Sequence, residues 1–315
     1  IWEETFMSAT YRQQAPAKVN LFLHVTGKRD DGYHLLESLV CFTATGDVLS
    51  GELRSDDQIT LSITGPMAAT LAQNDINENL VMQATKLLQD TCAPKQGADL
   101  ILDKRLPIAS GIGGGSADAA AAIRLLREMW KLDLDAHTLS HIALSLGADV
   151  PVCLHGETCV MSGIGEEITE LPDLPPVPIV LINPGKAVST PEIFKARADE
   201  GFSPTGAWQG NQTFQSAASL ADALSECGND LTLPATGILP EICDVLNALA
   251  REDGCLLARM SGSGATCFGI YDTTSQAERA AHAIATQNPD WWISPTHILS
   301  EKTREQAEIG AAFPD

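Results

Sequence analysis

The sequence predicts a mixed fold of helices and strands, divided into two domains. Its 315 residues are enough to form two hydrophobic cores. Alternating apolar residues predict strands, first over residues 18–25, while the alanine- and leucine-rich run at 118–130 predicts a helix. The proline-rich stretch at 171–178 is the best candidate for a hinge. We therefore expect one domain over residues 8–172 and a second over residues 178–315.

Composition and charge exclude several classes of protein. Hydrophobic residues make up 44% of the chain and charged residues 19%, as in ordinary globular proteins. The formal net charge of -21 argues against general affinity for nucleic acids or anionic membranes. An anionic ligand must then be bound by local backbone donors and a few cations. We expect a small-molecule ligand, and neither a nucleic acid nor a membrane as partner.

The cysteines and the N-terminal residues indicate where the protein works. None of the 8 cysteines forms a Cys-x-x-Cys pair, and several stand in apolar runs. This pattern is typical of buried thiols in a reducing compartment, and it does not favour structural zinc. The first residues lack the basic-then-apolar pattern of a signal peptide, and no apolar run reaches the roughly 18 residues of a membrane span. We expect a cytoplasmic protein.

The first third of the chain is predicted to be rich in strands. Residues 18–25 alternate as a half-buried strand does, with valines and leucines on the core face. Lys18 and Asn20 then share the opposite, polar face. The polar turn that follows carries the aromatic ring of Tyr33 and the imidazole of His34. Further strands are expected at residues 38–44, 47–53, 58–63 and 99–103, and a helix at about 79–90.

Helix signals are clearest in the middle of the chain. Asp135 is a typical N-cap and Gly147 a typical C-terminal stop, which predicts a helix between them. The apolar run at 150–154 predicts a strand that begins just after Asp149, because Pro151 disfavours helical backbone in the residue before it. Later elements are expected as a strand at 179–182, a loose loop at 201–219, an amphipathic helix at 240–252, and strands near 255–259 and 266–271.

The glycine-rich run at 107–117 is the most informative motif. Four of the five positions 111–115 are glycine, and the run leads directly into the predicted helix. Without Cβ atoms the backbone N–H groups stay accessible, and the positive end of a helix dipole reinforces them. A flexible turn without a ligand is the alternative reading. The run predicts a phosphate site, and therefore a nucleotide.

Two common phosphate loops do not match this run. A Walker loop needs Gly-Lys followed by Ser or Thr, and no such triplet occurs in the chain. A dinucleotide fingerprint needs a third glycine where Ser116 stands, and no acidic residue ends a second strand about 20 positions later. The missing third glycine also argues against an NAD-dependent oxidoreductase.

Asp149 and Lys18 are candidates for phosphoryl-transfer chemistry. A rigidly held carboxylate such as Asp149 could orient an acceptor hydroxyl, which supplies most of what this loose transition state requires. Lys18 could stabilise the charge that develops during transfer. The alternatives are a turn-capping Asp149 and a Lys18 that reaches solvent from a sheet edge. The sequence leaves both pairs of readings open.

Three segments, at 15–21, 107–120 and 260–265, resemble the galactokinase, homoserine kinase, mevalonate kinase and phosphomevalonate kinase superfamily. Residues 32–34, 103–107 and 147–151 resemble those members that use ATP to phosphorylate the 2-hydroxyl of a cytidine diphosphate-linked methylerythritol, a step of non-mevalonate isoprenoid synthesis. The resemblance implies an α+β fold with an N-terminal domain like ribosomal protein S5 and a smaller α/β C-terminal domain.

The resemblance also implies roles for individual residues. Lys18 and Asp149 match the catalytic pair, with Asp149 accepting the proton of the acceptor hydroxyl. The acceptor would be bound by a set spread over the chain: Asn20, Tyr33, His34, Thr190, Phe194, Gly262 and Gly264. The ATP site would comprise Asn79, Leu80, Lys104, Pro107, Ser110, Gly111, Gly113, Gly114, Gly115, Ser116 and Ala117. Mg²⁺ would accompany ATP, although no acidic residue matches a magnesium ligand.

One residue departs from the pattern of the superfamily. Asp118 stands where relatives often carry a neutral residue. A carboxylate suits a helix start, but it would repel a phosphate if it faced inward. The remaining alternatives are a homoserine or mevalonate kinase, for which a ring-stacking pair such as Tyr33 and His34 has no use, and a catalytically inactive nucleotide-binding regulator.

Overall fold

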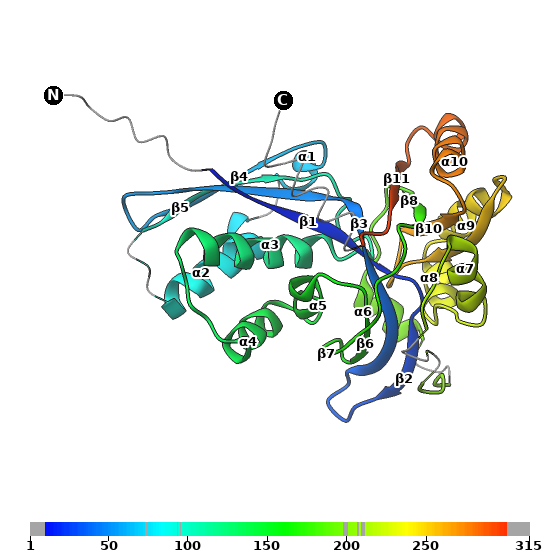
Figure 1. Cartoon of the computed structure of the whole chain (residues 1–315), viewed down its shortest axis with the longest axis horizontal. Coiled ribbons are helices and arrows are strands. Elements are labelled where there is room, and N and C mark those ends of the chain that lie inside the picture. The colour runs from blue at the N-terminus through cyan, green and yellow to red at the C-terminus, as the bar shows by residue number, and fades with distance from the viewer. Residues whose placement is uncertain are drawn as a thin grey trace. The chain divides into compact units, whose positions relative to one another are not determined.

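The computed structural model describes residues 10–300, apart from 73–74, 93, 95, 198–200, 207 and 209–211. They form two compact units, each assembled from separate stretches of chain (Figure 1). The first unit comprises residues up to 16, 46–108 and 114–155, and the second comprises 17–45, 109–113 and the chain from 156 onward. The expected domain limits at residues 8 and 315 lie outside the described residues. The expected hinge at 171–178 stays a prediction.

In the first unit, helices cover a small group of strands. Strand β5 pairs parallel with β4 and antiparallel with the second half of β3. Helix α3 packs closely on these strands because Gly51 has no side chain; a Cβ there would lie 2.9 Å from Leu100 and from Leu125 of α3. Helices α2, α4 and α5 pack on α3. The elements are β1 (Tyr11–Asn20, which continues into the second unit), β3 (His34–Leu53, whose first part belongs to the second unit), β4 (Ile59–Thr64), α1 (Ala68–Leu71), the 3₁₀ helix η1 (Ile76–Glu78), α2 (Leu80–Cys92), β5 (Ala98–Asp103), α3 (Gly114–Met129), α4 (Ala136–Leu146) and α5 (Val150–His155).

In the second unit, a four-stranded antiparallel sheet has the order β11-β8-β10-β9. Helices α9 and α10 pack on it. The first half of β3 pairs with β2 and β6, and β6 pairs with β7. The elements are β2 (His24–Lys28), β6 (Cys159–Gly163), β7 (Glu167–Glu170), β8 (Pro178–Asn183), α6 (Thr190–Ala196), α7 (Ala217–Ser225), α8 (Thr232–Ile238), α9 (Glu241–Arg251), β9 (Cys255–Met260), β10 (Cys267–Tyr271), α10 (Thr274–Gln287) and β11 (Trp292–His297).

The helical spacing of apolar residues explains how α9 is held on this sheet. Ile242, Val245 and Leu249 recur every three or four positions, and all three are fully buried. Burial of each such side chain stabilises the fold by about 1.5–3 kcal/mol. They share one core with Val180 and Ile182 of β8. No helix within the described ranges is both long and apolar enough to cross a membrane.

Several predicted elements are confirmed with nearly their predicted bounds. Asp135 caps α4 by accepting a hydrogen bond from the Thr138 N–H at 2.7 Å, and Gly147 ends the helix. The predicted helices at 79–90 and 240–252 are α2 and α9. The predicted strands at 58–63, 99–103, 179–182, 255–259 and 266–271 are β4, β5, β8, β9 and β10. Of the expected loop at 201–219, residues 207 and 209–211 lie outside the described residues, and α7 begins at Ala217.

The prediction of a half-buried strand over 18–25 was wrong. Strand β1 ends at Asn20, and β2 begins at His24. The polar face is buried as well, with Lys18 exposed by only 3% and Asn20 by 1%. Alternation identified the core face correctly but could not reveal that polar partners cover the other face. The strands expected separately at 38–44 and 47–53 are one continuous strand, β3.

The strand predicted at 150–154 is instead the short helix α5. The backbone carbonyl of Asp149 accepts the first helical hydrogen bond, from the Cys153 N–H at 3.1 Å. Pro151 therefore stands in the first turn, where its missing N–H costs nothing and its fixed φ suits the helix. Helix α3 also begins at Gly114, four residues before the expected start at Asp118. In both places a helix start was misread, because Gly and Pro usually break helices only in their interior.

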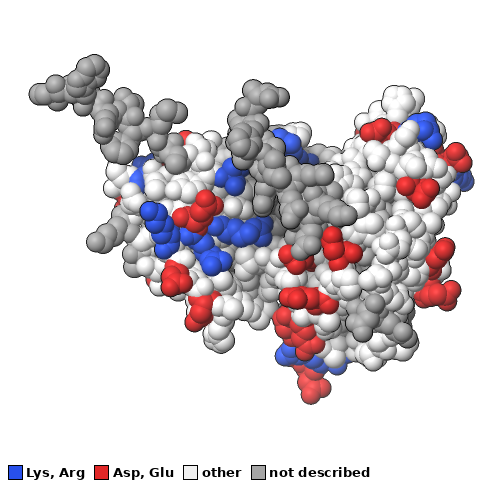
Figure 2. All heavy atoms as spheres, viewed as in Figure 1, with Lys and Arg blue, Asp and Glu red and all other residues white. Residues whose placement is uncertain are grey.

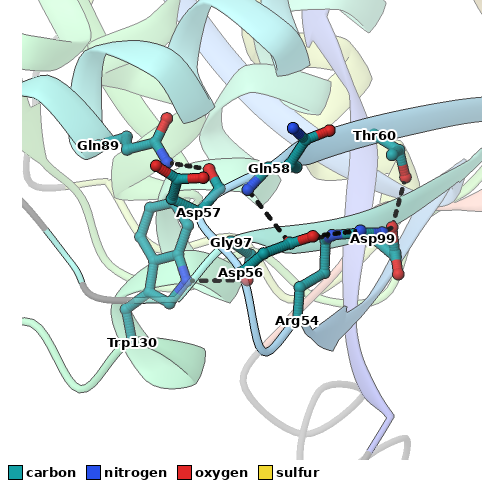
Figure 3. Close-up of polar contacts among 9 residues, drawn as sticks. All are labelled: Arg54, Asp56, Asp57, Gln58, Thr60, Gln89, Gly97, Asp99 and Trp130. Carbon is teal, nitrogen blue, oxygen red and sulfur yellow. Dashed lines mark hydrogen bonds and ion pairs between the residues drawn. The ribbon is translucent and has the colours of Figure 1, made fainter.

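A tight turn at one end of the first unit depends on Gly97 (Figure 3). The Gly97 N–H donates to the Asp56 carbonyl at 2.5 Å, and the Gly97 carbonyl accepts from Trp130 Nε1 at 3.5 Å. Nearby, the Arg54 guanidinium binds the carboxylates of Asp56 and Asp99, each at 2.6 Å. A Cβ at Gly97 would lie 1.9 Å from the Gln58 carbonyl oxygen, a backbone atom that cannot simply rotate away.

We expect Gly97→Ala to lower the free energy of unfolding by about 2 kcal/mol or more, because the backbone of the turn must move. Urea denaturation measures the loss. Gly237→Ala is the matched control: it lies in α8 with no heavy atom within 4 Å of the added Cβ. It should be neutral or stabilise by up to about 1 kcal/mol. Equal stability of the Gly97 variant and wild type would contradict this account of the turn.

Candidate active site

In the second unit, buried hydrogen bonds fix the part of the glycine run at 109–113. The Lys18 N–H donates to the Ile112 carbonyl at 3.0 Å, and the Thr266 N–H donates to the Ser110 carbonyl at 3.0 Å. Ser261 Oγ donates to the Gly111 carbonyl at 3.0 Å. The carbonyls of the run are therefore held on both sides, by two backbone N–H groups and by the Ser261 hydroxyl.

Gly111 and the second glycine turn approach each other closely. The Gly111 φ angle is 75°, and a Cβ there would lie 2.5 Å from the Ser261 carbonyl oxygen. Gly262 and Gly264 also have positive φ, of 56° and 85°. A Cβ at Gly262 would lie 2.7 Å from the Gly111 carbonyl oxygen and 3.4 Å from Asn20 Oδ1. Three sequence-predicted positions, 20, 111 and 262, are thus brought together in this unit.

Lys18 and Asn20 are both buried at the end of β1. Lys18 lies against Gly113, where an added Cβ would be 3.1 Å from the Lys18 Cβ. Asn20 Nδ2 donates to Ser38 Oγ at 2.8 Å, which in turn donates to the Phe22 carbonyl at 2.5 Å. Asn20 Oδ1 is buried and has no hydrogen-bond partner among the described residues. Such an acceptor is suited to a ligand that brings its own donor.

An aromatic pair lies at the start of β3. The rings of His34 and Phe194 are stacked, with their centroids 4.8 Å apart. Burial, together with the positive charges of Lys28 and Arg197, lowers the pKa of His34 below its ordinary value. The imidazole is therefore neutral near pH 7 and keeps both a donor and an acceptor. The Tyr33 ring next to it is 59% exposed.

Helix α6 brings two predicted residues to the second unit's site. It carries Phe194, and its first residue, Thr190, shares a hydrogen bond with Ser263 Oγ at 2.7 Å. Ser263 belongs to the glycine turn described above. Thr190 is thus tied to the turn, and Phe194 to His34, by contacts from a single helix.

In the first unit, the rest of the glycine run forms the first turn of α3. The first four N–H groups of a helix have no partner within it, so Gly114, Gly115, Ser116 and Ala117 present donors there. Leu80 begins α2, and a Cβ at Gly115 would lie 3.4 Å from the Leu80 side chain. Asn79 Oδ1 accepts from the Val81 N–H at 2.9 Å, so this side chain caps α2. Pro107 is buried just before the run.

Lys104 lies at the centre of a buried ion group. Its ammonium contacts one carboxylate oxygen of Asp47 and one of Asp118, each at 2.6 Å, and all three side chains are at most 4% exposed. Burial opposes the charged ammonium, but the two carboxylates outweigh it and raise the pKa of Lys104. Burial also raises the pKa of Asp118 to about 7, with Asp47 adding to the effect and Lys104 opposing it.

The sequence left open which way Asp118 points, and the structure answers it. Asp118 faces inward, toward Lys104, with Oδ2 in the ion pair. Its Oδ1 is buried without a hydrogen-bond partner among the described residues. Asp47 accepts in addition from the backbone N–H groups of Arg105, at 2.5 Å, and Leu106, at 2.9 Å. Asp47 thereby fixes the turn after β5.

Asp149 stands at the N-terminus of α5, within the first unit. Helix α5 packs on α3, and Arg124 of α3 donates to the Cys153 carbonyl of α5 at 3.0 Å (Figure 1). Asp149 is therefore held by the same helix that carries the first turn of glycines. Its rigid backbone comes from a helix start, not from the strand that was predicted.

Sequence reasoning missed several residues that hold the site in place. Asp47 is the first residue of the strand that was predicted at 47–53, and no sequence pattern marks it as a partner of Lys104. Asn229 Nδ2 donates to the carbonyls of Met260 and Gly262, both at 2.8 Å, and thus supports the glycine turn from a distant part of the chain. Ser261 belongs to the segment at 260–265 that was singled out from the sequence. Its hydroxyl is the one sequence signal that could have indicated its anchoring role.

The charge of the chain is unevenly spread. Lys and Arg side chains gather on the face of the first unit that Figure 2 shows. On the face drawn for the second unit, Asp and Glu predominate. The net charge of -21 thus leaves a basic surface on the first unit.

Among the described residues, no group of three or more His, Cys, Asp and Glu could hold a metal ion.

Comparison with known families gives the class of protein. Residues 79–157 match the family described as GHMP kinases N terminal domain, and residues 212–290 match GHMP kinases C terminal. The crystal structure of L. major mevalonate kinase in complex with R-mevalonate covers 96% of this chain and 99% of its own, with a TM-score of 0.67 and 15% identity. That likeness concerns the fold, which is of the α+β type.

Relatives are similar along nearly the whole chain. The 4-diphosphocytidyl-2-C-methyl-D-erythritol kinase of Paramagnetospirillum magneticum is 48% identical over 91% of this chain and 98% of its own. The enzyme of that name from Rhodospirillum rubrum is 43% identical over 94% and 95%. A crystal structure of 4-(cytidine 5'-diphospho)-2C-methyl-D-erythritol kinase has a TM-score of 0.74 and 33% identity, covering 92% of this chain and 100% of its own. The chain belongs to the GHMP kinase family and is an ATP-dependent kinase.

We expect Ser261→Ala to lower the free energy of unfolding by about 1–3 kcal/mol. The Ser261 hydroxyl accepts from the Asn20 N–H at 3.1 Å and donates to the Gly111 carbonyl, so its loss leaves one buried and one partly buried backbone group without this partner. Urea denaturation checks this. The exposed Ser225 hydroxyl also donates to a backbone carbonyl, and Ser225→Ala should change stability by less than about 0.5 kcal/mol. Equal effects of the two substitutions would refute the anchoring role of Ser261.

Proposed function

We propose that this kinase transfers the γ-phosphate of ATP to the 2-hydroxyl of 4-(cytidine 5'-diphospho)-2-C-methyl-D-erythritol, in non-mevalonate isoprenoid precursor synthesis. The similar relatives named above carry that substrate in their names. The single observation within this chain that favours it is the stacked pair of His34 and Phe194. A planar pyrimidine can stack on such rings, whereas homoserine and mevalonate offer no ring.

Binding of the acceptor would use groups of the second unit. Neutral His34 can donate to and accept from the edge of a cytosine, with Tyr33 exposed beside it and Thr190 held on the adjacent turn. The unpartnered Asn20 Oδ1 can accept a hydrogen bond from a hydroxyl of the acceptor. Gly262 and Gly264 would contribute the backbone of their turn, whose positive φ angles of 56° and 85° favour glycine.

ATP binding would use the run from Ser110 to Ala117. The absence of side chains at its glycines and the N–H groups of the first α3 turn suit a polyphosphate. Asn79 and Leu80, at the start of α2, would lie near the adenine. Mg²⁺ belongs to the proposal as the counter-ion of ATP; it is usually held by substrate phosphates and water with few protein ligands. We derive no step through a protein-bound metal.

Phosphoryl transfer would proceed with Asp149 as proton acceptor and Lys18 as the cation. The Asp149 carboxylate would orient the 2-hydroxyl and take its proton as the oxygen bonds to the γ-phosphorus. The bond from γ-phosphorus to the bridging oxygen breaks, and ADP leaves with that electron pair. Lys18 would stabilise negative charge on the transferring group. We place the reaction in the cytoplasm.

We expect Asp149→Asn and Lys18→Ala each to lower kcat by about 10²–10⁴-fold, because each removes a group that acts in the transition state. Both variants should still bind ATP, as isothermal titration with a non-hydrolysable analogue would show. Coupled measurement of ADP release gives kcat. Full activity in either variant would remove that residue from the mechanism.

Turnover with different acceptors tests the substrate, and Phe194 sharpens the test. Wild type should turn over the cytidine-linked acceptor and neither homoserine nor mevalonate. Phe194→Ala should raise KM for that acceptor about tenfold and leave KM for ATP unchanged, because the stacking of the Phe194 ring on His34 is lost. Phe194→Leu keeps the bulk and should lie between the two. Equal use of mevalonate, or an unchanged acceptor KM in Phe194→Ala, would contradict the proposal.

A further inference from the structure

The simplest interpretation of Lys104 is that its positive charge binds the phosphates of ATP. The surroundings of the ammonium argue otherwise. It is 3% exposed, and it already contacts two carboxylates at 2.6 Å each. If all three groups are ionised, the ion group carries a net negative charge, so Lys104 offers no excess positive charge to a polyanion.

We propose that Lys104 is a positioning residue: it binds Asp118 and thereby holds the first turn of α3 in place for the phosphates of ATP, without touching them itself. This inference rests on the proposed function, since it concerns the ATP site of that proposal. It assigns Lys104 a role different from that of a phosphate ligand.

The first turn of α3 needs such an anchor because of its own sequence. It opens with Gly114 and Gly115, and glycine is the least favourable residue in a helix after proline. The Lys104 ammonium lies directly beneath this turn, 3.3 Å from where a Cβ on Gly114 would be. A lone cation at the positive end of a helix dipole is unfavourable, and the Asp118 carboxylate reverses that effect.

The other end of the anchor is equally well fixed. Asp47, in β3, binds the Lys104 ammonium and also the backbone N–H groups of the two residues that follow Lys104. The chain around Lys104 is therefore clamped to β3 at three points. Within the described residues, the ion pair between Lys104 and Asp118 links this clamp to α3.

The two roles predict opposite effects for Asp118→Ala. If Lys104 attracted the phosphates directly, removal of a competing carboxylate would free its charge, and the ATP analogue would bind more tightly. If Lys104 positions the turn, Asp118→Ala disconnects it, and we expect the dissociation constant to rise about tenfold. Asp118→Asn keeps a hydrogen-bond acceptor for Lys104 and should stay within about threefold of wild type.

A double-mutant cycle with Lys104→Met completes the test. Isothermal titration of the full-length protein with a non-hydrolysable ATP analogue measures each dissociation constant, and thermal unfolding without nucleotide checks that each variant is folded. Lys104→Met should weaken binding about tenfold in wild type but not further in the Asp118→Ala background. Additive weakening to about a hundredfold, or tighter binding by Asp118→Ala, would overturn the inference. If Lys104→Met does not fold, the sign of the Asp118→Ala effect decides alone.

Arg105→Met is the matched control. Arg105 is the neighbouring cation, but it is exposed and paired with Asp103 at 2.6 Å. It should bind the analogue within about twofold of wild type; a tenfold loss would mean that general charge, not positioning, governs affinity. In Asp118→Ala, KM for ATP should rise, whereas kcat and KM for the acceptor should stay unchanged. A merely structural defect would not produce this pattern. Failure of wild type to bind the analogue would refute the proposed function itself, whereas tight binding with an additive cycle would refute only this inference.

Discussion

The contact of the Lys104 ammonium with two buried carboxylates is the interaction on which the first unit most depends. Removal of the Lys104 ammonium would leave two buried carboxylates without compensation, and breaking a buried pair in this way typically costs about 3–5 kcal/mol. Asp47 joins it to β3 and the turn after β5, and Asp118 joins it to α3. Helix α3 also packs on α5, at whose N-terminus Asp149 stands.

The second unit uses a different solution for the same problem of fixing flexible glycines. Here uncharged groups hold the backbone: the Ser261 hydroxyl binds residues 20 and 111, and the Asn229 amide binds the carbonyls of 260 and 262. Glycine turns lose much conformational entropy on folding, so they stay ordered only when such bonds compensate for that cost. Charged anchors in one unit and neutral anchors in the other produce the same result, a glycine-rich backbone held at fixed places.

Much of the fold could be predicted from sequence because local signals decide it. Asp135 and Gly147 gave the bounds of α4, and the spacing of Ile242, Val245 and Leu249 gave α9. Three motif residues of the second unit, Asn20, Gly111 and Gly262, lie close together there, and their roles in binding stay a prediction. What could not be predicted depends on partners distant in sequence. Neither the burial of Lys18 nor the bond from Asp47 to Lys104 leaves a local pattern, and the helix starts at Gly114 and Val150 follow from capping geometry.

The proposed function depends most on the identity of the group that is phosphorylated. Incubation of wild type with Mg²⁺, ATP and the cytidine-linked methylerythritol, followed by ³¹P NMR and mass spectrometry of the products, measures this directly. We expect ADP together with an acceptor that carries one new phosphomonoester, on its 2-hydroxyl. A phosphate at another hydroxyl, or ADP with inorganic phosphate and an unchanged acceptor, would contradict it.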